Sequence, residues 1–393
     1  MYKILTLNNI SVAGLDRLPR DNYEVASEIT HPDAILLRSQ KMHGMSIPET
    51  VKAIGRAGAG VNNIPVAEMT EKGIPVFNAP GANANAVKEL VLAGALLAAR
   101  NLGQAWRFAT ELSGDDGVIS KAVESGKKNF VGFELPGRTM GVIGLGAIGV
   151  KVANACRALG MNVIGYDPTI TVQSAWKLAS EVEQALSVDD LLSKSDFVTF
   201  HVPLTDATAN MINADRLKLM KPGSVILNFA RNGIVDDQAT VEALDSGQLY
   251  AYVCDFPSNL LKDHPRVITL PHLGASTKEA EDNCAIMVAD EVRDYLENGN
   301  IHNSVNFPDI NLPRNGGFRI AVVNNNVPNM VGQISTDLAN EGLNILDMLN
   351  KSRDNIAVTL LDVDRQPTQE LLRTLASIDG VLSVRSLSGD GAE

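Results

Sequence analysis

Apolar and polar positions alternate regularly over the first 80 residues of the chain. Short apolar runs are separated by longer stretches with helical spacing, which is typical of repeated strand–helix–strand units. Such units form a parallel sheet covered by helices, and the run 34–37 is apolar on both faces, as a buried parallel strand is. The predicted strands are 3–7, 34–37, 53–56 and 75–78.

A second series of the same kind begins at Arg138, after a long Ala- and Leu-rich helix predicted over 84–101. Segment 103–128, between the two, is less regular. Helices are predicted over 149–159 and 237–245, and the pattern therefore indicates a second parallel-sheet lobe. Its predicted strands are 139–143, 162–166, 197–201, 224–228, 250–254 and 267–270.

The order of elements changes towards the C-terminus. A long amphipathic helix is predicted over 281–298, with Gly299 as its C-cap, and the Asn-, Pro- and Gly-containing segment 303–317 is typical of a linker. The β-α-β-β-α-β order that follows predicts a small ferredoxin-like domain. The fold class is thus α/β, with two Rossmann-like lobes and a C-terminal α+β domain. The elements of that domain are strand 318–324, helix 329–341, strands 345–351 and 356–362, helix 368–377 and strand 381–387.

Composition narrows the class of protein. The 393 residues suffice for two or three domains, and a net charge of −12 without a long basic run argues against nucleic-acid binding. No apolar stretch is long enough to span a bilayer. Three widely spaced cysteines indicate neither a disulfide framework nor a zinc site and favour reduced thiols. We expect a cytoplasmic protein with no metal, nucleic-acid or membrane partner.

The glycine-rich run Gly144–Gly149 follows an apolar strand and precedes a helical run. In this setting Gly144 permits a tight turn, Gly146 lets a pyrophosphate approach the backbone, and Gly149 lets helix and strand pack closely. The start of the helix offers N–H groups and a favourable dipole to phosphate. Glycine triplets also occur in ordinary turns, but this context favours a bound dinucleotide.

Asp167 ends the next predicted strand, at the distance expected for the acid that binds the ribose hydroxyls. A carboxylate there repels a 2′-phosphate, so the sequence favours NAD over NADP. The alternative is a strand-end aspartate that caps a turn beside Pro168.

Polar segments follow three strands of the second lobe, where α/β folds bind their ligands. Oxidation of a secondary alcohol by hydride transfer needs a base for the hydroxyl proton and a cation for a carboxylate. His272 and Arg231 suit these two roles. Spacing alone does not show that they meet, since a histidine after a strand is more often structural and an arginine is usually a solvated charge.

Taken together, the run Gly55–Gly60, the glycine turn and the segments around Arg231 and His272 resemble the D-isomer-specific 2-hydroxyacid dehydrogenases over almost the whole chain. The resemblance implies a discontinuous substrate-binding domain (1–100 and 284–316), an NAD-binding Rossmann domain (101–283) and a regulatory ACT domain (317–393). It also implies an NAD-dependent oxidoreductase of amino-acid biosynthesis. Members with this organisation oxidise 3-phospho-D-glycerate to 3-phosphohydroxypyruvate, the first step of L-serine biosynthesis.

The resemblance also implies roles for individual residues. His272 would be the acid/base and Arg231 the cation that orients the substrate, while Lys127 and Lys128 would form a basic patch offered to a neighbouring subunit. Substrate contacts would come from Arg38, Ser39, Arg56, Gly58, Ala59, Gly60 and Asn83. Cofactor contacts would come from Gly144, Gly146, Ala147, Ile148, Gly149, Asp167, His201, Pro203, Thr208, Phe229, Ala230, Arg231, Asp255, His272, Leu273, Gly274 and Ala275.

One position departs from the family pattern. The family pairs its catalytic histidine with a glutamate, and alignment on the segment Asp255–Pro257 puts Asn259 at that position. Asparagine accepts a hydrogen bond from an imidazole but cannot stabilise an imidazolium as a carboxylate does. We therefore expect reduced turnover or a changed pH profile, unless Asp263 folds back to supply the carboxylate.

The C-terminal domain holds no obvious catalytic set, which leaves two functions open. It can serve as a dimerisation module, or it can bind L-serine as an inhibitor between two copies, as in relatives. Asn326 and Asn344 fall at effector-contact positions, while Asn324 and Asn329 replace a histidine and a glycine common there. The resemblance implies a homodimer or homotetramer.

Two other functions compete with this hypothesis. One is a different reductase of the same fold, such as a glyoxylate/hydroxypyruvate reductase. Arg38 and Arg56 speak against it, because a small unphosphorylated acid needs no extra cations. The other is an NAD-sensing protein without activity, which Asn259 favours and the retention of Arg231 and His272 disfavours.

Overall fold

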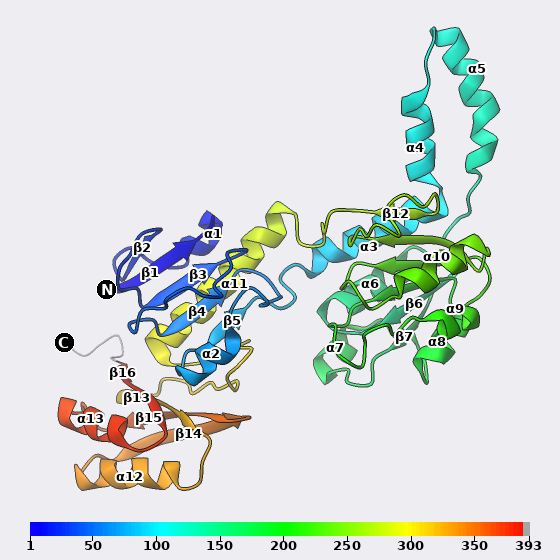
Figure 1. Cartoon of the computed structure of the whole chain (residues 1–393). Coiled ribbons are helices and arrows are strands. Elements are labelled where there is room, and N and C mark those ends of the chain that lie inside the picture. Colours follow the sequence, from blue (N-terminus) through cyan, green and yellow to red (C-terminus); the bar gives the residue numbers. More distant parts are fainter. Residues whose placement is uncertain (388–393) are drawn as a thin grey trace. The chain divides into compact units, whose positions relative to one another are not determined.

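The chain folds into two units in the computed structural model, which describes residues 1–387. The first unit comprises Met1–Ala82 and Glu281–Glu393, and the second comprises Asn83–Ala280 (Figure 1). The predicted C-terminal domain runs to residue 393, so its residues 388–393 lie outside the described part. The predicted α/β fold class is confirmed.

A five-stranded parallel sheet opens the first unit, in the order β2-β1-β3-β4-β5. Four of its strands match the prediction, and the fifth, β2, was missed because only one of its residues is buried. Helix α11 (Lys278–Asn298) packs on the sheet, and a Cβ on Gly55 would touch Val288 and Val292 of this helix. The strands are β1 (Tyr2–Leu7), β2 (Tyr23–Ala26), β3 (Ala34–Leu37), β4 (Ala53–Arg56) and β5 (Val76–Asn78), joined by α1 (Val12–Leu15) and α2 (Val66–Glu71).

The C-terminal segment of the same unit forms an antiparallel sheet in the order β14-β15-β13-β16, with the predicted β-α-β-β-α-β succession. One face of the sheet packs on its own two helices. The other shares a continuous apolar core with α11 and the N-terminal sheet, so this domain is docked on the first unit. Its elements are β13 (Phe318–Asn325), α12 (Met330–Asn340), β14 (Ile345–Arg353), β15 (Ile356–Val363), α13 (Gln369–Ser377) and β16 (Val381–Leu387).

A buried ion pair joins the two parts of the first unit. The Arg319 side chain is fully buried, and its Nε and Nη2 each lie 2.7 Å from one carboxylate oxygen of Asp362. The remaining N–H groups donate to the main-chain carbonyls of Asn298, Leu312 and Pro313, at 2.6–3.2 Å. The guanidinium thus ties the C-terminal sheet to the end of α11 and to the linker.

The second unit contains a seven-stranded parallel sheet in the order β12-β11-β10-β9-β6-β7-β8. Every strand predicted for it is present, and only the two-residue β8 was not foreseen. The strands are β6 (Thr139–Ile143), β7 (Asn162–Tyr166), β8 (Glu183–Gln184), β9 (Phe197–Phe200), β10 (Ser224–Asn228), β11 (Leu249–Cys254) and β12 (Val267–Thr269). The helices include α3 (Ala84–Ala99), α6 (Ala147–Ala158), α7 (Val172–Lys177), α8 (Val188–Lys194), α9 (Ala214–Leu219) and α10 (Asp237–Asp245).

The division by packing falls at Ala82 and Ala280, while the resemblance implied domain boundaries at 100 and 283. The difference at the first boundary arises from α3, whose buried residues Val87, Val91 and Ala95 belong to the core of the second unit. The functional identity of the domains stays a prediction.

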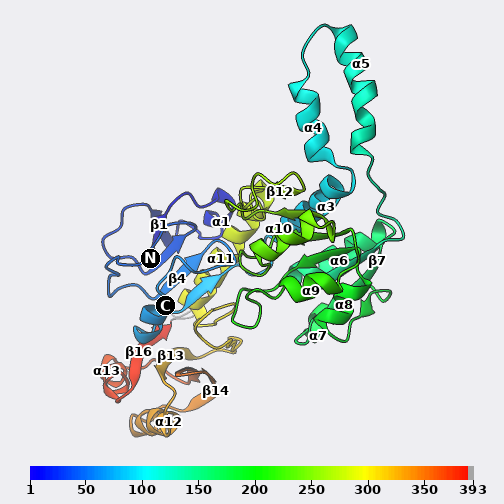
Figure 2. The ribbon, with the colours of Figure 1, turned by 45° about the vertical axis from the view of Figure 1, so that its right-hand side comes forward.

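Segment 102–126, for which no regular pattern was recognised, is a helical hairpin of α4 (Leu102–Glu111) and α5 (Asp116–Gly126). We call this hairpin the arm. Both ribbon views show it standing away from the sheet of its own unit (Figure 2). Its apolar residues include Trp106, which is 72% exposed, and this absence of a buried face explains why the helical period was not recognised.

No helix within residues 1–387 is both long and apolar enough to cross a membrane.

Replacing Arg319 with Met would leave the Asp362 carboxylate buried and unpaired. We expect the free energy of unfolding to fall by about 3–5 kcal/mol, measured from the midpoint of urea unfolding. Replacing Asp362 with Leu in addition should restore part of the loss, because no buried charge remains. Arg365→Met is the control, since Arg365 pairs with Asp364 at the surface. A loss below about 1 kcal/mol for Arg319→Met, as for exposed pairs, would contradict the prediction.

Glu291 of α11 is a buried carboxyl without a cationic partner. Asn303 donates a hydrogen bond to its Oε1 at 2.6 Å, while Oε2 has no partner among the described residues. Burial raises the pKa of Glu291 to about 8, the bond from Asn303 opposes the rise, and Asp290 and Asp309 add to it. The native state therefore retains a proton that the unfolded chain releases above about pH 4.5.

It follows that the Glu291 proton stabilises the fold at low pH and that this stability is lost as pH rises towards 8. We expect Glu291→Gln to unfold like the wild type at pH 4.5 and to be more stable at pH 9 by roughly 3 kcal/mol, measured by urea unfolding. The exposed Glu341→Gln is the matched control. An equal difference at both pH values would be incompatible with a proton held by Glu291.

Candidate functional site

The glycine turn lies between β6 and α6, and its three glycines answer three different demands. Gly144 has φ +89°, and a Cβ there would lie 2.5 Å from the carbonyl oxygen of His201. A Cβ on Gly149 would clash with the carbonyl of Gly144. A Cβ on Gly146 would meet nothing within 4 Å. The protein itself explains the first and third glycines, and the second opens the backbone to a ligand.

The N-terminus of α6 suits an anion. Gly146 is its N-cap, so no side chain satisfies the free N–H groups of the first turn. These N–H groups and the helix dipole favour a phosphate at this position. The turn therefore fits the pyrophosphate of a dinucleotide.

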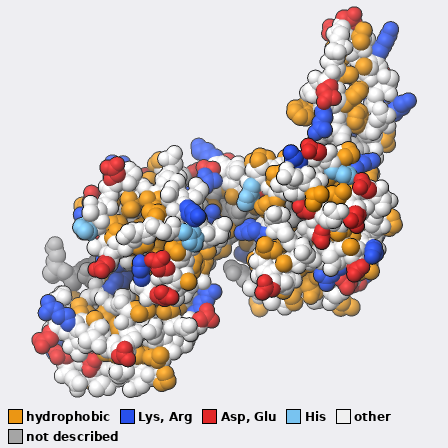
Figure 3. All heavy atoms as spheres, viewed as in Figure 1, with side chains coloured by type: hydrophobic (Ala, Val, Ile, Leu, Met, Phe, Trp, Pro, Cys, Tyr) orange, Lys and Arg blue, Asp and Glu red, His pale blue; other side chains and the backbone are white. Residues whose placement is uncertain are grey.

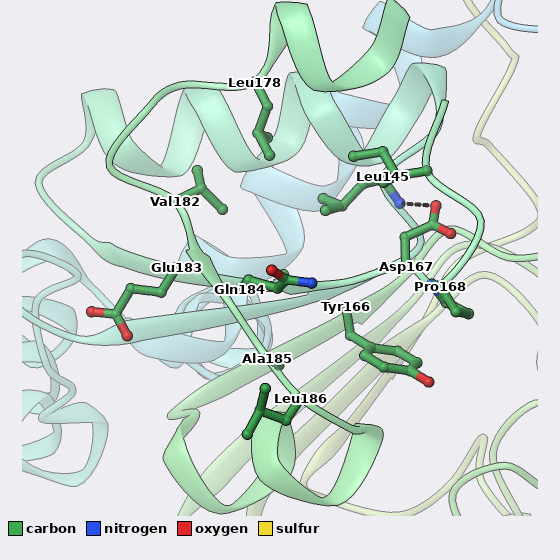
Figure 4. A pocket seen from close by; sticks show the side chains of 12 residues that line it. Leu145, Tyr166, Asp167, Pro168, Leu178, Val182, Glu183, Gln184, Ala185 and Leu186 are labelled. Atoms are coloured by element: carbon green, nitrogen blue, oxygen red, sulfur yellow. Dashed lines mark hydrogen bonds between the residues drawn. The ribbon is translucent and has the colours of Figure 1, made fainter. Parts of the chain in front are cut away.

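Asp167 lies directly after β7, beside the glycine turn. Its Oδ2 accepts a hydrogen bond from the backbone N–H of Leu145 at 2.8 Å, drawn in Figure 4. Its Oδ1 accepts hydrogen bonds from the N–H and hydroxyl of Thr169, at 2.9 and 3.1 Å. These bonds fix the carboxylate at the mouth of a cavity of about 430 Å³, where a ribose with two hydroxyls can reach it.

The walls of this cavity are largely apolar. Leu145, Leu178 and Val182 point into it, and Ile170 completes the lining on that side (Figure 4). Such walls suit a flat heterocycle such as adenine. Apart from Leu145 they come from the loop region 167–186, which carries no motif, so sequence reasoning could not find them.

Arg231 and His272 lie on two loops of the second unit. The buried Asn228 at the end of β10 orders the first loop, because it donates to the Arg231 carbonyl at 3.0 Å and accepts from the Ala230 N–H at 3.2 Å. The Arg231 guanidinium is exposed, with Nη1 bonded to the Ala230 carbonyl. His272 is exposed at φ +46°, a conformation that few side chains adopt, and its N–H donates to the Asp255 carbonyl at 3.0 Å.

Several predicted cofactor residues lie on loops at the same sheet edge. The hydroxyl of Thr208 donates to the Pro203 carbonyl at 2.6 Å and closes the loop after β9. His201 contacts Thr199, and burial lowers the pKa of His201 to about 3, so its ring is neutral at physiological pH. The Phe229 ring is buried against Gly94 of α3, so only its backbone is left for a ligand.

In the first unit, the structure brings Arg38, Arg56 and the loop Gly58–Gly60 together. Arg56 Nε donates to the Arg38 carbonyl at 3.1 Å, and the Arg56 guanidinium lies where a Cβ on Gly58 would be. Asn78 donates to the Ala59 carbonyl at 2.5 Å and holds the loop against β5. These residues follow β3, β4 and β5, at the carboxyl edge of the sheet.

Two predicted substrate residues lie apart from this cluster or add little to it. Ser39 is exposed and its side chain makes no hydrogen bond within residues 1–387. Asn83 belongs to the second unit, where it precedes α3, and its buried Oδ1 has no partner among the described residues. The roles of both residues stay predictions.

Residues 92–274 match the NAD binding domain of the D-isomer specific 2-hydroxyacid dehydrogenases. A Methanocaldococcus jannaschii protein named D-3-phosphoglycerate dehydrogenase is 36% identical over 335 residues, which are 83% of this chain and 61% of that protein. An Escherichia coli (strain K12) protein of the same name is 32% identical over 352 residues, which are 86% of this chain and 82% of that protein. The chain belongs to the D-isomer-specific 2-hydroxyacid dehydrogenases.

The solved structure of a glyoxylate reductase from Paecilomyes thermophila has the same fold, with a TM-score of 0.63 and 26% identity over 77% of this chain and 98% of that one. The chain spans about three fifths of the length of the M. jannaschii relative. The predictions of the family and of NAD as its cofactor are confirmed. The roles of individual site residues stay predictions.

Asn259, the position that departs from the family pattern, is exposed. Within the described residues no hydrogen bond joins it to His272, and Asp263 pairs with Lys262 instead. A different carboxylate lies beside the histidine: burial raises the pKa of Asp255, and His272 and the N–H groups of Gly274 and Leu273 oppose the rise. Sequence reasoning assigned Asp255 to the cofactor alone, because nothing in the spacing shows that its carboxyl faces His272.

The C-terminal sheet and α12 enclose a cavity of about 150 Å³. Asn326 lines it, as the effector prediction requires, and the buried Asn324 lines it with an Oδ1 that has no partner among the described residues. Asn344 is exposed and does not line the cavity. Asn329 and Asn350 also line it, and no charged side chain does.

Asn259→Glu would return the carboxylate that the family pattern has at this position. We expect higher turnover, and we expect the limb of the pH–rate profile that follows the catalytic histidine to move to higher pH, because a carboxylate stabilises an imidazolium. The measurement is kcat/KM against pH, with Asp263→Asn as the control for an exposed charge change nearby. Identical profiles for Asn259→Glu and the wild type would sink the prediction.

Proposed function

We propose that this chain is an NAD-dependent dehydrogenase that oxidises 3-phospho-D-glycerate to 3-phosphohydroxypyruvate in the cytoplasm, the first step of L-serine biosynthesis. The observation that carries the proposal is the cluster of Arg38 and Arg56 beside the loop Gly58–Gly60, in a chain of this family. Two arginines exceed what a small unphosphorylated acid needs, and guanidinium groups match phosphate geometry. The relatives named D-3-phosphoglycerate dehydrogenase support the same substrate.

The reaction removes a hydride from C2 of the substrate and a proton from its hydroxyl. NAD, when bound, supplies the hydride acceptor. His272 takes the hydroxyl proton, and the nearby Asp255 carboxyl favours the imidazolium that results. Arg231 holds the substrate carboxylate and polarises the C2–O bond. In the first unit, the N–H groups of Gly58–Gly60 bind carboxylate oxygens, and Arg38 and Arg56 bind the phosphate.

The alternative of a glyoxylate/hydroxypyruvate reductase draws support from the glyoxylate reductase structure, which is 26% identical. The two functions differ in whether the distal group of the substrate carries charge. A sensor without activity is the third hypothesis, and Asn259 is the feature that favours it.

One assay separates the three hypotheses. We expect the enzyme to oxidise NADH at 340 nm far faster with 3-phosphohydroxypyruvate than with hydroxypyruvate or glyoxylate. His272→Gln should lower kcat by about 10²–10⁴-fold, because the acid/base is lost, and should bind NADH like the wild type in a fluorescence titration. Faster turnover of the unphosphorylated acids would favour the alternative reductase. NADH binding without turnover of any of them would favour the sensor.

We also propose that the cavity lined by Asn324 and Asn326 binds an effector, with L-serine as the candidate. The unpartnered Oδ1 of Asn324 can accept a hydrogen bond from an ammonium group, and the N-terminus of α12 carries no side-chain cap and can receive a carboxylate. The small cavity volume of about 150 Å³ restricts the ligand to a few heavy atoms.

Isothermal titration with L-serine tests this role. We expect a saturable heat and inhibition of the dehydrogenase, both of which Asn326→Ala weakens. D-serine is the matched control, because it presents the same groups in the wrong arrangement. No heat and no inhibition would leave only a structural role for the domain.

We propose that the arm mediates a homodimer. Its exposed apolar side chains include Leu102, Trp106, Val118 and Val123, and orange side chains are visible along it in Figure 3. Exposed apolar surface of this kind marks association sites. Sedimentation equilibrium measures whether the chain forms a dimer or the alternative tetramer.

A further inference from the structure

The start of α11 places a carboxylate on one of the two arginines of the first unit. Nη1 of Arg38 and Oε1 of Glu281 are 2.7 Å apart, and the two side chains are 36% and 44% exposed. Arg38 directly follows β3, while Glu281 lies in the first turn of α11, far away along the chain. Because the pair is open to water, a dissolved anion can reach the guanidinium and compete with Glu281.

The pair belongs to a larger charged cluster. Arg56 is bonded to the carbonyl of Arg38 at 3.1 Å. Both arginines and Glu281 also act on the buried thiol of Cys284, one turn further along α11: burial raises the pKa of Cys284, Arg38 and Arg56 lower it, and Glu281 raises it. The cluster thus holds two cations and one anion, which halves the positive charge that Arg38 and Arg56 would offer by themselves.

We propose that Glu281 is an exchangeable counter-anion of Arg38, which the distal phosphate of the substrate displaces. The proposal rests on the function proposed above, because it takes Arg38 as a phosphate ligand. Glu281 is a positioning residue in this scheme: it keeps Arg38 at the carboxyl edge of β3 while the substrate is absent, and it sets the affinity for the distal group. A phosphate carries nearly two charges at neutral pH and can replace one carboxylate, whereas a neutral hydroxyl cannot.

The size of the effect follows from the exposure of the pair. Exposed ion pairs are weak, so the exchange changes affinity by a factor of about five at most. The sign distinguishes this role from a structural one. If Glu281 competes with the phosphate, its neutralisation tightens phosphate binding; if Glu281 only anchors Arg38, its neutralisation releases the arginine and weakens binding.

Glu281→Gln removes the charge and keeps the size of the side chain. We expect KM for 3-phosphohydroxypyruvate to fall about three- to five-fold with kcat unchanged, and KM for hydroxypyruvate to stay as in the wild type. Glu279→Gln is the matched control, because Glu279 lies on the same turn, is exposed and forms no ion pair within the described residues. It should leave both KM values unchanged.

Inorganic phosphate gives a second measurement that needs no turnover. In a thermal unfolding series, phosphate should raise the Tm of Glu281→Gln at about three- to five-fold lower concentration than that of the wild type. An unchanged or raised KM for 3-phosphohydroxypyruvate in Glu281→Gln, or equal phosphate responses, would overturn the proposal. Failure of the wild type to reduce 3-phosphohydroxypyruvate would instead overturn the proposed function, and the phosphate series would still test Glu281.

Discussion

Parallel strand pairing is the constraint on which both units depend. A parallel strand cannot be followed by a hairpin to its neighbour, so the chain must cross over each sheet through a helix and enter every strand from the same end. All strand exits then meet at one edge, and polar residues that are far apart in the sequence gather there. The glycine turn, the Arg231 loop and the His272 loop share such an edge in the second unit, and Arg38 and Arg56 share one in the first.

This constraint explains which parts of the molecule could be predicted. Buried parallel strands are short apolar runs, and β6, β7 and β10 lie where the pattern placed them. The glycine turn was recognisable because its demands are local: a positive φ, a close contact and an open face within six residues. Only a strand with little buried surface, such as β2, escaped the pattern.

The features that were missed depend on contacts between distant segments. The ion pair of Arg38 with Glu281 joins two positions that no spacing rule connects. Asp255 was placed near the cofactor, but its proximity to His272 depends on how two loops fold over β11 and β12. The arm escaped because its apolar residues face solvent, so the helical pattern has no buried side to reveal it. Sequence patterns report burial against the rest of the chain, and these features are made of charge or of surface left open.

Helix α11 crosses the boundary between the two units, because Lys278–Ala280 fall in the second and the residues from Glu281 onwards in the first. A helix is a continuous ladder of hydrogen bonds between residues four apart, so no covalent joint at this boundary is free of secondary structure. The far end of the same helix is bonded to the buried Arg319. Exchange of the nucleotide-binding unit between relatives by recombination would therefore have to join two half-helices in register. We expect the two units and the C-terminal domain to have been inherited together, as one evolutionary block.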